Sequence, residues 1–220
     1  DYGIPQKRER VFIVGFRSDL GNEWSFPRPT HSFDALLHAQ WVTGDYWERL
    51  GVPKTRRPVL DASLLARVKE LESQLFPLDE QPWRTVRDAL EGMPDPRDAA
   101  ANDYYDHNFQ PGARAYKGHT GSPLDLPAKA LKAGDHGVPG GENMMVMDDG
   151  NVRYFSVRES ARIQTFPDGY VFQGSWSESM RQLGNAVPVG LARRVAASVA
   201  ESLAENALRA FNVRQDRNAA

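Results

Sequence analysis

The sequence predicts a mixed α/β fold, on two observations. Arg10–Phe16 is a short, β-branched apolar run of the kind that forms a buried strand. Residues 61–76, and the segment that starts at Pro188, instead repeat their apolar side chains at helical spacing. At 220 residues, the chain is long enough for one hydrophobic core with a small additional lobe.

The N-terminal strand is expected to need partners. A core strand has to pair with neighbouring strands, so Arg10–Phe16 favours a missing N-terminal portion, and the chain starts at Asp1 rather than at Met. Residues 18–60 predict irregular structure, because the two prolines that flank Arg28 exclude a helix there.

Two helices are predicted in the next part of the chain. The apolar spacing of residues 61–76 predicts the first helix, with Asp61 or Ser63 as its N-cap. Residues 84–91 predict a short second helix, which the following glycine and proline end. Residues 95–126 are polar and rich in turn formers, and they predict loops.

Two strands and a well-capped helix are predicted next. The strands are Ala128–Ala133 and Met144–Met147, and the glycine-rich stretch 134–141 separates them. The capping-box sequence Ser156–Glu159 then opens a helix that runs to about Thr165.

The C-terminal segment predicts two more helices. Ser177–Leu183 is the first, with Gly184 as its stop signal. Pro188 begins the second, longer helix, whose apolar residues recur every four positions and predict one buried face. Residues 211–220 are expected to form a frayed tail.

The charge distribution places any contact with phosphate in local clusters. The formal net charge is −2, which gives no overall attraction to nucleic acid. Residues 151–194 hold six arginines against three acidic residues, a local charge of +3. A solvated charged surface is the alternative explanation for Arg193 and Arg194.

The composition excludes several classes of protein. Zero cysteines exclude disulfides and a cysteine nucleophile within this chain. The five histidines lack zinc-binding spacing, so we expect no metal site. No apolar run approaches 18 residues, which predicts a soluble, cytoplasmic protein that does not associate with membranes.

The first of three motifs is Gln6–Arg10. Gln6, Arg8 and Arg10 alternate, so an extended backbone places them on one face. Two guanidinium groups beside an amide suit a phosphate or the acceptor edge of a base. An exposed polar strand end with surface ion pairs is the alternative.

The second motif is Arg158–Pro167. Arg158 and Arg162 lie four residues apart on one helical face, so they are candidates to reach the same phosphate or to brace the same loop. A capped amphipathic helix is the alternative, and the capping box predicts a structural role for Glu159.

The third motif is Gln182–Pro188. A turn between two helices explains Gly184 and Pro188. It explains Asn185 less well, because an Asn side chain offers both a donor and an acceptor to a neighbouring loop or a bound small molecule.

In this order, with a variable polar region between the first and second, the three motifs resemble the eighth, ninth and tenth motifs of the cytosine-5 DNA methyltransferases. The resemblance covers about residues 2–205. Further matches to the family are Phe26–His31, Thr85–Leu90 and Pro127–Leu131.

The resemblance implies the C-terminal portion of a class I methyltransferase fold that carries a small, β-containing target-recognition lobe. Residues 1–17 would be the closing strand of the catalytic domain, and residues 18–155 the target-recognition region. Residues 156–210 would return to the catalytic domain as helices, before the tail 211–220.

The family's chemistry implies a divided enzyme. Family members flip a cytosine out of the duplex, attack its carbon 6 with a cysteine, and transfer a methyl group from S-adenosylmethionine to carbon 5. In the family, the cysteine, a supporting glutamate and the glycine-rich cofactor motif all precede the eighth motif. The resemblance therefore implies that this chain recognises DNA and closes the fold. It binds S-adenosylmethionine only with an N-terminal portion and is inactive alone.

The resemblance also implies roles for motif residues. Arg10 matches the position that contacts the flipped cytosine or its backbone, Arg8 matches a phosphate-side or structural companion, and Gln6 borders the same pocket. Asn185 and Ala186 would lie near the methionine end of the cofactor, although the family usually has serine in place of Ala186.

Five residues are the candidates for DNA binding. Arg158 and Arg162 are expected to contact the duplex from their helix. In the glycine-rich loop, His136, Glu142 and Asn143 offer donors and acceptors for base edges. A surface loop without DNA contacts is the alternative for these three.

Three functional hypotheses follow. The first is a portion or natural subunit of a DNA cytosine-5 methyltransferase, with double-stranded DNA and the N-terminal catalytic portion as partners. The second is a stand-alone, non-catalytic module that binds specific DNA sequences. The third is a generic α+β domain. The sequence alone does not identify the DNA target, nor does it separate a restriction–modification enzyme from a solitary or phage-encoded one.

Overall fold

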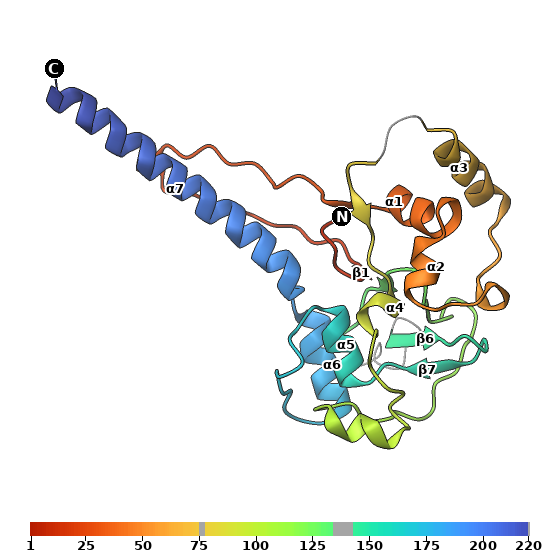
Figure 1. The fold of residues 1–220 in the computed structure, drawn as a ribbon. Helices are drawn as coiled ribbons and strands as arrows, with labels where there is room; N and C mark the ends of the chain where they lie inside the picture. The colour runs from red at the N-terminus through yellow and green to blue at the C-terminus, as the bar shows by residue number, and fades with distance from the viewer. Residues whose placement is uncertain (75–77, 134–142, 220) are drawn as a thin grey trace.

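The computed structural model describes residues 1–74, 78–133 and 143–219, with the side chains of the last helix described up to Arg209. It has three parts, which we call the lobe (residues 31–83), the body (residues 1–7 and 84–188) and the arm (residues 8–30 and 189–219) (Figure 1). Short helices and two- or three-residue strands make up the lobe and the body, so the predicted mixed α/β class is confirmed.

The lobe is mainly helical. Asp61 accepts a hydrogen bond from the Leu64 amide at 2.9 Å and caps the predicted helix of residues 61–76. Of the leucines that the structure describes in this helix, only Leu71 is buried. A small core packs around Trp47, which is fully buried. The lobe elements are β2 (His31–Ser32), α1 (Phe33–Leu37), a π-helical turn (His38–Val42), α2 (Asp45–Arg49), a 3₁₀ turn (Lys54–Arg56), α3 (Ala62–Glu72) and β3 (Gln81–Pro82).

The body is built around a small sheet. Its strand order is β4-β6-β7, with β4 parallel and β7 antiparallel to β6, while β1 pairs in parallel with β5 and places Gln6 opposite Ala128. The body elements are β1 (Gln6–Lys7), α4 (Val86–Ala89), a 3₁₀ turn (Ala99–Asp103), β4 (Ser122–Pro123), β5 (Ala128–Lys129), β6 (Met144–Val146), β7 (Val152–Tyr154), α5 (Val157–Ile163) and α6 (Trp176–Asn185).

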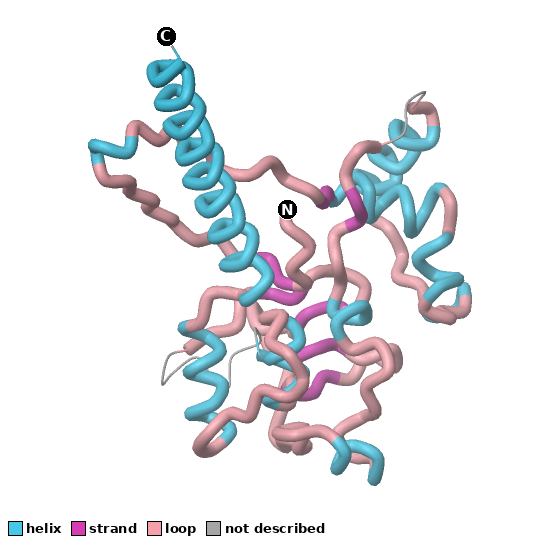
Figure 2. Tube along the Cα trace, turned by 60° about the vertical axis from the view of Figure 1, so that its left-hand side comes forward, coloured by secondary structure: helices cyan, strands magenta, loops and turns pink. Residues whose placement is uncertain are grey.

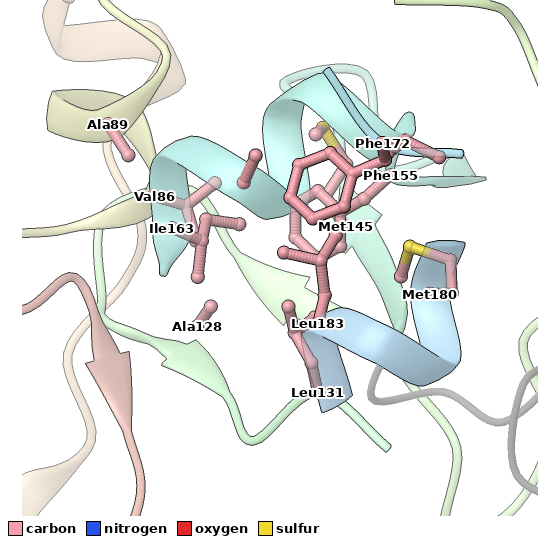
Figure 3. Close-up of a cluster of buried hydrophobic side chains, with 12 residues drawn as sticks. Val86, Ala89, Ala128, Leu131, Met145, Phe155, Ile163, Phe172, Met180 and Leu183 are labelled. Atoms are coloured by element: carbon pink, nitrogen blue, oxygen red, sulfur yellow. The ribbon is translucent and has the colours of Figure 1, made fainter. Parts of the chain in front are cut away.

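The main hydrophobic core lies between this sheet and the helices α4, α5 and α6 (Figure 3). Phe155, Ile163, Met180 and Leu183 are completely buried in it. Burial of each such side chain contributes about 1.5–3 kcal/mol, so this core holds the sheet and the helices α4, α5 and α6 as one unit.

The arm projects away from the rest of the molecule (Figures 1 and 2). It consists of α7 (Val189–Ala219), a 3₁₀ turn (Ser18–Leu20) and extended chain beside the helix. The Trp24 indole donates to Ser198 Oγ at 3.1 Å, and the Asn22 amide donates to the Ser202 carbonyl at 2.9 Å. The helix continues to Ala219, through nine of the ten residues that we expected to fray.

The prediction of one buried face along α7 is only partly correct. Val195 is buried, but Leu203 is 40% exposed. The single loop segment beside the helix covers too little of it to bury the whole apolar face.

The predicted buried strand Arg10–Phe16 is wrong for this chain. Its residues are extended but pair with no other described strand, and Val11 and Ile13 are 89% and 94% exposed. The apolar pattern is that of a strand, but within the described residues no neighbour offers the hydrogen bonds a strand needs.

Two further predictions needed correction, and one strand, β7, was not predicted. The predicted strand Ala128–Ala133 is confined to Ala128–Lys129. Gly184 lies inside α6 and does not stop it. A Cβ at that position would lie 2.6 Å from the Ala133 nitrogen. Close packing, and not helix termination, therefore requires this glycine.

Candidate functional site

The first motif lines a cavity between the N-terminal segment and the first turns of α7. This cavity of about 310 Å³ is bordered by Gln6, Arg8 and Arg10, with Leu191 and Val195 of α7 on the other side. The three polar side chains of the motif thus line one cavity, but Glu9, which strand alternation would turn to the opposite face, lines it as well.

Gln6 is the least satisfied of the three. It is 7% exposed, yet neither atom of its side-chain amide has a hydrogen-bond partner among the described residues. β1 holds its backbone against β5. A buried amide without partners costs free energy, so Gln6 is suited to a ligand group or a further protein segment in this cavity.

Arg8 and Arg10 differ sharply in their environment. The Arg8 guanidinium donates to the Leu131 carbonyl at 3.2 Å and to the Gly184 carbonyl, so it ties β1 to the C-terminal motif. Burial, and then the charge of Arg10, lower the pKa of Arg8 below its ordinary value. Arg10 is exposed, and among the described residues its side chain hydrogen-bonds only to the neighbouring Glu9 carbonyl, at 2.7 Å.

The second motif forms α5, where Arg158 is fully buried. Its guanidinium donates to the carbonyls of Tyr105, Pro167 and Tyr170, and Asp106 lies 3.6 Å from it. Arg158 therefore has no exposed surface with which to reach a phosphate in this structure.

Arg162 is also held within the protein. It forms a two-pronged ion pair with Asp168 at 2.8 and 2.6 Å, donates to the Glu91 carbonyl at 3.1 Å, and lies over the Tyr104 ring. The hydrogen bond from Arg162 lowers the pKa of Asp168. Arg158 and Arg162 both brace the turn that follows α5, Arg158 through the Pro167 and Tyr170 carbonyls and Arg162 through Asp168.

Glu159 has the structural role predicted for it and one more that the sequence did not reveal. Its carboxylate accepts from the Ser156 amide at 2.8 Å, which completes the capping box, and Ser156 Oγ accepts from the Glu159 amide. The same carboxylate receives two bonds from the buried Arg153 at 2.7 and 2.6 Å. This ion pair joins β7 to α5 in the protein interior.

The third motif joins α6 to α7. The Gln164 amide donates to the Leu183 carbonyl at 2.8 Å, and the Gly190 amide donates to Thr165 Oγ1 at 2.7 Å, so the second motif positions the third. Asn185 ends α6 with an exposed side chain, and no described residue hydrogen-bonds to it. Ala186 is half-buried beside it.

Asn185 and Ala186 fit one edge of a small-molecule site. The Asn185 amide offers a donor and an acceptor, and the 40% exposed Val187 adds apolar surface next to it. An edge of this kind is compatible with S-adenosylmethionine, but most contacts to such a cofactor would come from elsewhere.

Of the three DNA-binding candidates in the glycine-rich loop, only Asn143 lies within the described residues. His136 and Glu142 lie outside the described residues. Asn143 is fully buried, and its side-chain oxygen accepts from the Lys132 amide at 3.1 Å. Its amide nitrogen lies 3.5 Å from the Lys132 carbonyl. Asn143 thus fixes the base of the loop and presents no free group to DNA.

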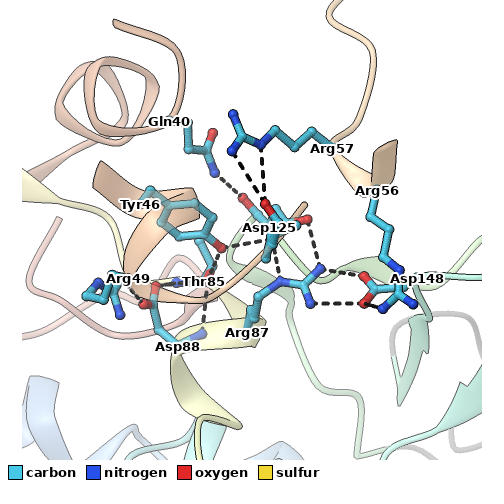
Figure 4. A network of polar contacts seen from close by, with 11 residues as sticks. Gln40, Tyr46, Arg49, Arg56, Arg57, Thr85, Arg87, Asp88, Asp125 and Asp148 are labelled. Atoms are coloured by element: carbon cyan, nitrogen blue, oxygen red, sulfur yellow. Dashed lines mark hydrogen bonds and ion pairs between the residues drawn. The ribbon is translucent and has the colours of Figure 1, made fainter. Parts of the chain in front are cut away.

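A polar network that the sequence did not predict joins the lobe to the body (Figure 4). The buried Asp125 receives hydrogen bonds from Tyr46 at 3.0 Å and from Arg87 at 2.7 and 3.1 Å, and Arg87 also pairs with Asp148 at 2.6 Å. Burial, and then the charge of Asp125, raise the pKa of Tyr46 far above its ordinary value, so its hydroxyl stays protonated. The network fixes the orientation of the lobe relative to the body.

The described residues contain neither a metal-binding cluster nor a membrane-spanning helix. The described ranges hold no group of three or more His, Cys, Asp or Glu residues placed to share a metal ion. Among the described residues, no helix combines the length and the apolar character needed to cross a lipid bilayer.

The chain is similar to several type II methyltransferases. Type II methyltransferase M.BspRI of Lysinibacillus sphaericus is 33% identical over 93% of this chain and 42% of its own length. M.BsuRI of Bacillus subtilis is 30% identical over 91% of this chain and 40% of its own length. M.Eco47II of Escherichia coli is 31% identical, over 92% and 44%. The chain thus spans less than half the length of these relatives.

A model of one family, described as C-5 cytosine-specific DNA methylase, matches residues 1–201, nearly the whole chain. It extends over the cavity wall formed by Gln6, Arg8 and Arg10, the braced helix α5 and the junction at Asn185. The chain therefore belongs to the C-5 cytosine-specific DNA methylase family.

Proposed function

We propose that this chain is the C-terminal portion of a DNA cytosine-5 methyltransferase. It carries the target-recognition region and the segments that close the catalytic domain. Methyl transfer takes place only when an N-terminal portion of the same enzyme joins it. That portion holds the cysteine nucleophile, the supporting glutamate and most of the site for S-adenosylmethionine, which supplies an electrophilic methyl group.

The observation that carries this proposal is the unpaired segment 8–16. It keeps the apolar pattern of a core strand, yet Val11 and Ile13 are almost fully exposed. Strands from another portion of the enzyme would cover these side chains and satisfy the backbone hydrogen bonds. The absence of cysteine from the sequence supports the same division, because the family's reaction requires a thiolate.

The motif side chains have two kinds of role: some contact the substrate or the cofactor, and others hold the backbone in place. Arg10 and Gln6 face the target cytosine and its backbone, since Arg10 is free of acidic partners among the described residues and the buried Gln6 amide is unsatisfied. Arg8, Arg158 and Arg162 hold the backbone around them. Asn185 contacts the cofactor from one edge.

Methyl transfer from labelled S-adenosylmethionine to unmethylated DNA tests the proposal. The assay compares this chain, the N-terminal portion and their mixture, and we expect activity only in the mixture. Activity of this chain alone would contradict the proposal. An inactive mixture, together with sequence-selective DNA binding by this chain, would favour a non-catalytic binding module.

A pair of variants locates the site within that assay. In the active mixture, Arg10→Ala is expected to lower kcat/KM by roughly a hundredfold or more, because it removes a charge-assisted contact to the target nucleotide. Arg17→Ala is the control, since Arg17 lies in the same extended segment but is paired with Asp19 at 2.5 Å on the surface. Equal activity of the two variants would remove Arg10 from the site.

A further inference from the structure

A tight hairpin in the body stands out among the loops. Tyr116 and His119 face each other across a two-residue turn, with backbone hydrogen bonds of 3.1 and 2.8 Å between them. Gly118 has a φ of +85°, which this turn requires. The two rings lie 4.4 Å apart at an angle of 32°, and Tyr116 is 53% exposed.

The hairpin is fixed on the sheet. Gly121, with a φ of +80°, lies so close to β6 that a Cβ would be 3.2 Å from the Met145 carbonyl carbon. The next residue, Ser122, belongs to β4, and its hydroxyl accepts from the Lys129 amide at 3.0 Å. These two contacts fix the position of the hairpin relative to β4 and β6.

The chain segment that forms the hairpin carries basic residues and no acidic ones. Residues 107–124 contain no Asp or Glu, but they contain Arg114 and Lys117, which are both exposed. Lys129 donates to Thr120 at 3.1 Å beside the hairpin, and Lys7 is the register partner of Lys129 on β1. Within the described ranges, none of these four cations forms an ion pair with an acidic residue, unlike most arginines of the lobe.

We propose that this basic hairpin, with the strip formed by Lys7, Arg114, Lys117 and Lys129, binds the phosphate backbone of double-stranded DNA and sets the height of the recognition region above the duplex. Tyr116 presents its ring and hydroxyl to the DNA between the cations. The inference rests on the function proposed above. It assigns the contacts with DNA to residues that the sequence did not indicate, because the sequence pointed to α5 and to the loop that contains His136.

Duplex DNA fits this strip better than other acidic partners. Four unpaired cations on a rigid base suit a regular array of phosphates, and their number predicts a steep salt dependence of about 0.9 per phosphate contact on logarithmic axes. The exposed ring of Tyr116 beside these cations adds a stacking contact for nucleic acid, which an acidic polypeptide does not use.

The test measures binding of the 220-residue chain to a short, unmethylated DNA duplex over a range of salt concentrations. Arg114→Ala with Lys117→Ala is expected to weaken binding by roughly tenfold or more and to lower the logarithmic salt slope by about two. Lys54→Ala with Lys69→Ala is the control, because it removes the same charge from exposed lobe positions outside the strip. Thermal unfolding should be unchanged in both double variants, since all four side chains are exposed.

Each outcome separates the two proposals. If both double variants bind DNA equally well while the wild-type chain completes methyl transfer with the N-terminal portion, the hairpin inference fails and the proposed function stands. Equal binding of the wild-type chain to polyglutamate would reject DNA as the partner of the strip. If the wild-type chain neither binds DNA nor completes methyl transfer, both proposals fail.

Discussion

At the scale of single residues, charged side chains in the motifs act mainly as internal braces. Arg158 uses its guanidinium to hold three backbone carbonyls, and Arg8 holds two. Glu159 closes a capping box and binds Arg153 in the interior. A buried guanidinium that satisfies several carbonyls fixes loop geometry, because those acceptors would otherwise lack partners.

Glu159 can be tested against a closely matched residue. Glu159→Ala leaves the Arg153 charge buried without its partner, which is expected to lower the free energy of unfolding by about 3–5 kcal/mol. Glu178→Ala is the control, since Glu178 closes the same capping box on α6 but is exposed, and it should cause a much smaller loss. Urea unfolding measures both, and equal losses would show that capping alone accounts for Glu159.

At the scale of elements, local signals were predictable and long-range contacts were not. The capping boxes and N-caps depend on residues three apart, so the start of α5 and the helix of residues 61–76 could be predicted from the sequence. Gln6, Arg8 and Arg10 do line one cavity, but strand alternation is not the full reason, since Glu9 lines it too. The burial of Arg158 was not predictable, since its acceptors lie 9 to 53 residues away.

Gly184 shows why one prediction about an element failed. Glycine disfavours helices, so the sequence predicts a helix end, but the close approach of α6 to residues 132–133 requires glycine in the helix. Gly184→Ala is therefore expected to destabilise the protein by at least about 2 kcal/mol, because the added methyl group overpacks the junction. If helix propensity dominated, the same change would stabilise it by about 1 kcal/mol.

The control for this change is Gly169→Ala. Gly169 has an ordinary φ and open space around the position of a Cβ. Thermal unfolding of the two variants should therefore give shifts of clearly different size. A stabilised Gly184→Ala protein would mean that α6 and residues 132–133 are not tightly packed in solution.

At the scale of the whole molecule, the lobe and the body form a finished structure, whereas the arm does not. Two hydrophobic cores and the Asp125 network hold the lobe and body together. The arm leaves Val11, Ile13 and part of α7 exposed, beside the cavity that contains the unsatisfied Gln6 amide. Apolar side chains in an extended, unpaired segment favour association with another polypeptide.

Ile13→Lys tests whether this surface receives the N-terminal portion. Because Ile13 is 94% exposed, we expect the thermal unfolding of this chain to be unchanged and its self-association, measured by sedimentation, to decrease. Complementation of methyl transfer by the N-terminal portion should weaken by roughly tenfold or more, since a lysine would have to enter an apolar sheet face. Val59→Lys is the matched control, because Val59 is 97% exposed but lies in the lobe, away from the unpaired segment. If both variants impair complementation equally, added charge is the cause, and the segment 8–16 is not the docking surface.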